Sequence, residues 1–150
     1  MKNTYYSGDY LKFLKILDKH KVDYLIIGGY ATMLYTKIPR GTKDMDTWIR
    51  QTEKNAKNIS EAIKEFAGKE IPIEILLKEN QRIEIKSETF KIEIWTSQEI
   101  IKFEQAWDEK KTEKLGEITL KVISKNHLIK LKKHFNRPQD RLDLSLLEEE

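Results

Sequence analysis

The sequence contains no cysteine among its 150 residues. Disulfide bonds, catalytic thiolates and thiolate zinc sites are therefore excluded. Proline and glycine are sparse, with three and six copies, and no linker divides the chain. No apolar run approaches the ~20 residues that span a bilayer, and the N-terminus lacks the hydrophobic region of a signal peptide. We therefore expect a single domain over residues 1–150, located in the cytoplasm and without membrane contact.

The chain also lacks a strong charge imbalance. Charged residues make up 35% and hydrophobic residues 39%, with a net charge of +3. This composition is typical of a folded protein rather than a disordered one. The mild positive excess is compatible with a polyanionic partner but does not require one. The three histidines show no metal-ligand spacing, so we expect them at the surface.

Hydrophobic periodicity predicts a mixture of strands and helices. Apolar or alternating stretches predict strands at residues 24–27, 44–49, 82–86, 90–95 and 117–123. Helical spacing predicts helices over residues 8–20, 30–35, 52–67, 98–112, 125–135 and 139–150. The order of these elements predicts a small α+β domain, in which a mixed sheet is flanked by helices and followed by C-terminal helices.

Two aspartates stand out on the second predicted strand. Asp44 and Asp46 are two positions apart, so their side chains share one face of the strand. Their Cα atoms are expected roughly 6.6–6.8 Å apart. Two carboxylates at that spacing can jointly hold a pair of divalent metal ions about 3.5–4 Å apart. Because like charges on one face repel, a cation is their natural partner, although exposed strand residues would show the same spacing.

Gly28 and Gly29 follow the first predicted strand and precede a short helix. Glycine has no Cβ, so the backbone can approach a ligand closely at this point. The free N–H groups at the start of the helix suit phosphate oxygens. A plain turn would also account for the glycine pair. Together with Asp44 and Asp46, however, this stretch predicts the chemistry of a nucleoside triphosphate.

At these motifs the sequence resembles the nucleotidyltransferase superfamily, whose fold is shared with the beta-type DNA polymerases. Residues 28–31 (GGYA) and 40–46 (RGTKDMD) are most similar to minimal nucleotidyltransferases of bacteria, including those of toxin–antitoxin and abortive-infection systems. Residues 91–97 (KIEIWTS) resemble the strand that carries a third carboxylate, and residues 128–143 resemble the C-terminal segment. The resemblance covers about residues 20–147, nearly the whole chain.

The resemblance implies catalytic and metal-binding roles for three carboxylates, which are Asp44, Asp46 and Glu93. The implied cofactor is Mg²⁺, or Mn²⁺ in its place. Glu84 holds the same place as Glu93 in the neighbouring strand, and both are also compatible with solvated positions. The residues implied in nucleotide binding are Gly28, Gly29, Arg40, Thr42 and Lys132. For Arg40 a surface loop, and for Lys132 the solvated face of a basic helix, are the open alternatives.

The implied reaction moves a nucleoside monophosphate from an NTP to an acceptor and releases pyrophosphate. The acceptor is RNA or tRNA, a protein side chain, or a small molecule such as an antibiotic. The alternative is a catalytically weak or inactive partner-binding module, such as a toxin or antitoxin component. Thr47 and Glu93 favour that alternative, because the family commonly has an apolar residue and an aspartate there. A third hypothesis is a nucleic-acid binder that uses the basic helix at residues 125–133 and binds with a steep salt dependence.

Overall fold

The computed structural model describes residues 8–39 and 44–148. Over these residues the chain forms six strands and seven helices. In chain order they are α1 (Gly8–Lys19), β1 (Tyr24–Ile27), α2 (Gly28–Thr36), β2 (Asp44–Ile49), α3 (Glu53–Ala67), α4 (Ile73–Leu76), β3 (Arg82–Lys86), β4 (Lys91–Trp95), α5 (Phe103–Asp108), β5 (Lys111–Leu115), β6 (Ile118–Val122), α6 (Lys125–Phe135) and α7 (Pro138–Glu148).

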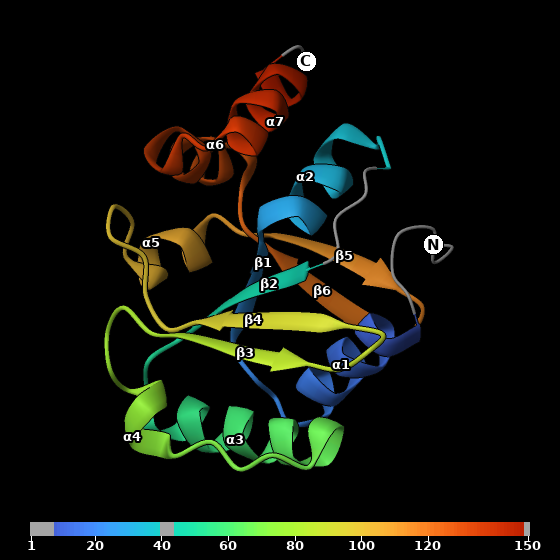
Figure 1. The fold of residues 1–150 in the computed structure, drawn as a ribbon, viewed down its shortest axis with the longest axis vertical. Coiled ribbons are helices and arrows are strands. Elements are labelled where there is room, and N and C mark those ends of the chain that lie inside the picture. The colour runs from blue at the N-terminus through green and yellow to red at the C-terminus, as the bar shows by residue number, and fades with distance from the viewer. Residues whose placement is uncertain (1–7, 40–43, 149–150) are drawn as a thin grey trace.

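The strands form one mixed sheet in the order β3-β4-β2-β1-β6-β5. The four residues of β1 are all buried, as a wholly apolar strand in a covered sheet should be. β1 pairs antiparallel with β2 and parallel with β6, while β2 pairs parallel with β4. The sheet with its flanking helices confirms the predicted α+β class (Figure 1).

The helices lie on both sides of this sheet. Figure 1 shows α1, α3 and α4 on one side, and α2, α5, α6 and α7 on the other. Two helix starts are confirmed by their caps, because the hydroxyls of Thr52 and Ser124 accept hydrogen bonds from the backbone N–H three residues on. None of the helices in the described ranges is long and apolar enough to cross a membrane.

The helix expected over residues 98–112 is wrong in extent. Only Phe103–Asp108 is helical, and Lys111–Leu115 forms strand β5. β5 pairs antiparallel with β6 through a turn at Gly116, whose φ of +64° lies in the left-handed region. The buried side chain of β5 at its turn end is Leu115, opposite Ile118. Pairing with the adjacent strand β6 in a hairpin therefore overrides the local helical pattern.

Candidate active site

The parallel pairing of β2 with β4 brings the three predicted carboxylates together. The register aligns Asp44 with Lys91 and Asp46 with Glu93. The side chain of Glu93 is 9% exposed, whereas that of Glu84 is 43% exposed and lies one strand further from β2. Of the two glutamates on the hairpin, Glu93 is therefore the one beside Asp46, as the sequence predicted.

Asp46 lies at the centre of this group. Its Oδ1 accepts a hydrogen bond from the indole N–H of Trp95 at 3.3 Å. Burial, a hydrogen bond with Glu93 and the charge of that residue together raise the pKa of Asp46 to about 7. Because the nearby charge of Glu93 disfavours a second negative charge, Asp46 stays partly protonated near neutral pH. A bound cation would relieve the same repulsion.

Gly28 closes the site from the other side. Its φ is +69°, and a Cβ at this position would overlap Oδ2 of Asp46. Only glycine fits both the turn and this close approach. α2 starts at Gly28, with Gly29 buried in its first turn and no side-chain cap at Ile27. Because Ile27 supplies no side-chain cap, an anion at this end of α2 would accept from the amides of Gly28 and Gly29.

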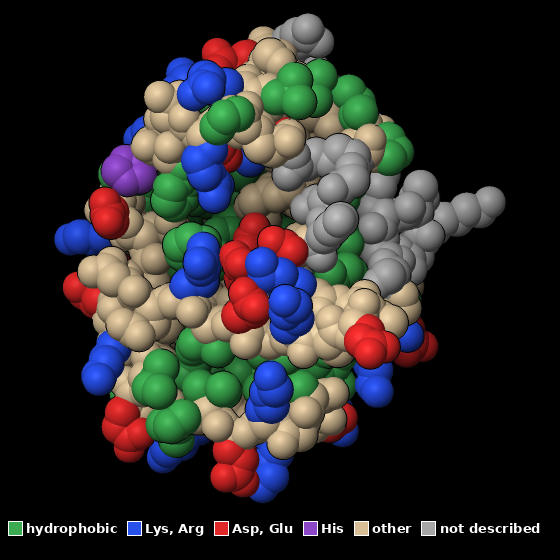
Figure 2. All heavy atoms as spheres, in the orientation of Figure 1, with side chains coloured by type: hydrophobic (Ala, Val, Ile, Leu, Met, Phe, Trp, Pro, Cys, Tyr) green, Lys and Arg blue, Asp and Glu red, His purple; other side chains and the backbone are tan. Residues whose placement is uncertain are grey.

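Lys91 lies among the carboxylates, which the sequence pattern did not reveal. Its Nζ is 3.5 Å from carboxylate oxygens of Asp44, Glu84 and Glu93. The charge of Asp44 is the largest factor that raises the pKa of Lys91. Figure 2 shows such a compact group of acidic and basic side chains over β2, β3 and β4. The ammonium therefore neutralises part of the acidic charge of the site.

The donor set fits a divalent metal ion. Carboxylate oxygens are the ligands that Mg²⁺ and Mn²⁺ prefer, and burial beside the charge of Glu93 raises the pKa of Asp46, so that a cation would favour its ionised form. In the described part of the chain, no three His, Cys, Asp or Glu side chains already stand at metal-holding geometry. Because Lys91 contacts two of the three carboxylates, metal binding requires its ammonium to move aside.

Lys91→Met is therefore expected to tighten Mn²⁺ binding in the absence of nucleotide. The variant removes a competing cation from the carboxylates, and at this partly exposed site we expect the dissociation constant to fall by about 3- to 10-fold. Isothermal titration calorimetry measures it. Lys57→Met, which removes the same charge from α3 far from the carboxylates, is the matched control. Unchanged or weaker binding by Lys91→Met would show that the ammonium does not compete with the metal.

Helices α6 and α7 contribute a second charged group at this site. A narrow hollow of about 30 Å³ is lined by Gly28, Asp46, Trp95, Lys132 and Arg137, among others. The Lys132 side chain is only 5% exposed, and its Nζ lies 2.9 Å from Asp143 and 3.5 Å from Asp140. The ammonium of Lys132 is thus held by two buried carboxylates rather than lying on a solvated face.

Arg137 is the exposed cation of this group, with its side chain 61% exposed. Its Nε donates to Asp140 at 2.7 Å, and its backbone N–H donates to the same carboxylate at 3.1 Å. The charges of Asp46 and Glu93 contribute to the raised pKa of Arg137, after the larger effect of the Asp140 hydrogen bond. Arg137 therefore stands on the rim of the hollow, oriented by Asp140.

Two of the predicted nucleotide-binding residues lie outside the described ranges. Arg40 and Thr42 are among the residues that the structure does not describe. His127 is buried, against the expectation that all histidines are at the surface, because the first turn of α6 packs inward. Two residues that the sequence did not assign to the site are Lys91 and Trp95. Parity places both on the face of Glu93 on β4, but it does not determine where the Lys91 ammonium ends.

Comparison with known proteins agrees with this geometry. The family model of the aminoglycoside-2″-adenylyltransferases matches residues 9–147. Among solved structures, a lincomycin-bound crystal structure of the lincosamide antibiotic adenylyltransferase LnuA matches with a TM-score of 0.68 and 16% identity. The match covers 97% of this chain and 98% of that one, and at this identity it concerns the fold alone. No curated protein matches the sequence.

Proposed function

Because the chain belongs to the aminoglycoside-2″-adenylyltransferase family, we propose that it transfers AMP from ATP to a hydroxyl group of a small-molecule antibiotic. The chain is a nucleotidyltransferase, and its family places it among enzymes that move a nucleoside monophosphate. What supports the choice of site most directly is the strand register that aligns Asp46 with Glu93, next to the close approach of Gly28.

In the proposed reaction, the acceptor hydroxyl oxygen attacks the α-phosphorus of ATP. The bond from that phosphorus to the oxygen bridging the α- and β-phosphates breaks, and pyrophosphate leaves. The hydroxyl proton passes to Glu93, which is buried beside Asp46. When bound by Asp44, Asp46 and Glu93, a divalent metal ion would stabilise phosphate charge and acidify the hydroxyl.

The nucleotide contacts come from the other side of the site. The backbone N–H groups at Gly28 and Gly29 are proposed to orient the β- and γ-phosphates for in-line attack. We assign Arg137 to the same phosphates, because its planar guanidinium is exposed on the rim and pre-oriented by Asp140. Lys132 acts on the nucleotide through this arrangement, by holding Asp140. Other phosphate contacts, proposed from the sequence alone, are Arg40 and Thr42.

The family favours a small-molecule acceptor over the RNA or protein acceptors that the sequence left open. Neither the family model nor the solved structure supports a toxin–antitoxin assignment. A partner-binding module without activity is likewise not favoured, because the chain belongs to a family of enzymes. Mg²⁺ is proposed as the metal ion, with Mn²⁺ as a possible substitute in the assay.

The proposal is tested with each of the four NTPs labelled at the α-phosphate, in the presence of Mg²⁺ or Mn²⁺. The acceptors are a polycationic aminoglycoside (kanamycin), a lincosamide (lincomycin), total tRNA and lysate protein. We expect label from ATP to enter an antibiotic with stoichiometric release of pyrophosphate, and EDTA to abolish the transfer. Label that enters only tRNA or protein would overturn the small-molecule acceptor, and preference for another NTP would overturn AMP transfer.

A further inference from the structure

Three neighbouring hollows lie between Asp46 and the end of β4. Trp95 and Phe135 line the narrow hollow at Asp46 and also a second hollow of about 180 Å³. Ser97 and Gln98 line this second hollow and also a third, of about 410 Å³. The three hollows therefore lie side by side, each pair in turn sharing two lining residues. We name the second and third together the β4 groove.

The lining of the β4 groove combines aromatic rings with amides and hydroxyls. Trp95 and Phe135 are in contact at one end, with ring centroids 6.0 Å apart. Trp48 and Phe103 meet edge-to-face at 5.3 Å at the other end. Recessed hydrophobic side chains are visible in Figure 2 beside the central charged group. The polar groups that line the groove between these ends come from residues Asn80, Gln81, Gln51, Thr52, Thr96, Ser97, Gln98 and Gln105.

Two buried donors at this groove have no hydrogen-bond partner within the described part of the chain. They are the indole Nε1 of Trp48 and the side-chain Nε2 of Gln98. Buried N–H groups are nearly always satisfied by protein, water or ligand. Because both atoms are buried, a ligand with ether, carbonyl or hydroxyl oxygens would supply acceptors here only after these side chains rotate toward the groove. Small-molecule sites commonly have volumes of about 300–1,000 Å³ and the same mixture of apolar walls and few polar groups.

The charges around the groove are balanced. Its lining includes three basic side chains, Arg50, Arg82 and Lys102, and three acidic ones, Glu79, Glu99 and Glu104. Glu104 is already bound by the guanidinium of Arg50, and Glu99 lies 3.3 Å from His134. No surplus of free carboxylates is therefore present in the described lining to receive several ammonium groups. Burying unpaired ammonium groups here would be unfavourable.

From these observations we propose that the β4 groove is the acceptor site, and that it takes a weakly charged, amphipathic glycoside rather than a polycation. Aromatic rings would cover the apolar faces of the acceptor, and the two free donors would bind its oxygens. Trp95 connects the groove to Asp46, so a hydroxyl at this end of the acceptor reaches the reacting phosphate. This inference rests on the proposed function, because it assigns the acceptor of the same reaction.

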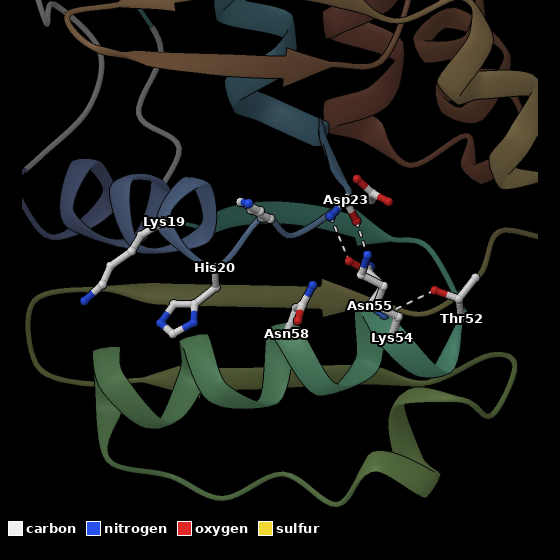
Figure 3. Close-up of a pocket in the computed structure, with 8 residues that line it drawn as sticks. Lys19, His20, Asp23, Thr52, Lys54, Asn55 and Asn58 are labelled. Carbon is white, nitrogen blue, oxygen red and sulfur yellow. Dashed lines mark hydrogen bonds between the residues drawn. The ribbon is translucent and has the colours of Figure 1, made fainter.

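A hollow on the other side of the sheet serves as a reference. It has about 410 Å³ and lies between the end of α1 and the start of α3 (Figure 3). The side chain of Asn55 in this hollow is fully used, since its amide bonds the backbone of Asp23 and Arg50. Its lining carries no tryptophan, tyrosine or phenylalanine. A ligand specific to the β4 groove should therefore leave this hollow unaffected.

The inference can be tested without turnover, by nuclear magnetic resonance of the indole N–H groups. The chain has three tryptophans, and each signal is assigned from a Trp→Phe variant. Lincomycin, which carries one amine, and kanamycin, a polyamine, are titrated into the protein saturated with Mg²⁺ and a non-hydrolysable ATP analogue. We expect lincomycin to shift the Trp48 and Trp95 signals saturably, because both residues line the β4 groove.

A blocking variant adds a matched comparison. Gln98→Phe places a ring where the two hollows join and should weaken lincomycin binding by about 10-fold or more. It should leave the shift of Trp95 on binding the ATP analogue unchanged. Asn58→Phe makes the same change in size in the reference hollow and should have no effect on either titration. Thermal melting confirms that both variants are folded.

The outcomes separate this inference from the proposed function. An unmoved Trp48 signal with both antibiotics, or equal weakening by both variants, would overturn the groove as acceptor site. Kanamycin binding as tightly as lincomycin would overturn the preference for a weakly charged acceptor. Lincomycin binding in the groove without any AMP transfer would support the site and overturn only the reaction.

Discussion

Asp46→Asn is expected to lower the rate of AMP transfer by about 10³-fold or more, while leaving the protein folded. The substitution removes the central carboxylate of the proposed metal site, and electrostatic stabilisation is the main contribution in a phosphoryl-transfer site of this kind. The asparagine keeps an oxygen for the indole N–H of Trp95. The geometry around Gly28 is therefore expected to survive, so the loss would reflect chemistry rather than unfolding.

The same variant is expected to be more stable than the wild type in EDTA at pH 8. In the folded protein the pKa of Asp46 is raised to about 7 from an ordinary value of 3.8. Between these values the folded state holds a proton that the unfolded state has lost, so the wild type loses stability as the pH rises from about 4 to 7. Above pH 7 the loss is complete, on the order of 2 kcal/mol after allowance for sharing with Glu93.

Thermal and urea unfolding of both proteins at pH 5 and pH 8 measure this difference. The stability advantage of Asp46→Asn should be small at pH 5 and larger at pH 8, and saturating Mg²⁺ should remove it by stabilising the wild type alone. Asp108→Asn, which neutralises an exposed carboxylate on α5, is the control and should show no such pH dependence. A variant less stable than the wild type at pH 8 would contradict the crowded-carboxylate description of the site.

The stretch from β1 to β2 could be read from the sequence because its signals are local. Four apolar residues followed by Gly28 and Gly29 specify a buried strand and a sharp turn into α2. The alternation around Asp44 and Asp46 specifies which residues share a face. The choice of Glu93 over Glu84, made from family resemblance, agrees with the register of β2 and β4. The catalytic roles of these residues and the single-domain organisation stay predictions.

What the sequence could not supply depends on how each element pairs and packs with others. The strand at Lys111–Leu115 exists because β6 pairs with it, and its own sequence, KTEKL, has little apolar content. The position of Lys91 depends on where a flexible side chain ends, which parity alone does not determine. The basic pattern of α6 suggested a solvated face, but α7 packs against α6 and encloses Lys132. The periodicity of the α6 sequence does not show that α7, which comes later in the chain, packs over Lys132.

The enclosed charges between α6 and α7 lead to the second large effect. Asp143→Ala is expected to reduce the free energy of unfolding by about 3–5 kcal/mol, because it leaves the ammonium of Lys132 buried without its nearer partner. Asp143 is fully buried and also accepts a hydrogen bond from Gln139. Urea unfolding at pH 7 measures the loss. Asp108→Ala removes an exposed carboxylate and should change the stability by less than about 0.5 kcal/mol.

The double variant Lys132→Met/Asp143→Leu separates stability from nucleotide binding. Replacing both members of a buried ion pair by apolar residues is often neutral, so the double variant should regain most of the stability that Asp143→Ala loses. In the double variant Asp140 would keep its hydrogen bond from Arg137 but lose the ion pair with the ammonium of Lys132. If Lys132 acts on the nucleotide by holding Asp140, the KM for ATP should rise only modestly, by about 3-fold, whereas Arg137→Ala should raise it about 10-fold or more. A larger rise in the double variant than in Arg137→Ala would instead assign the phosphate contact to Lys132 itself.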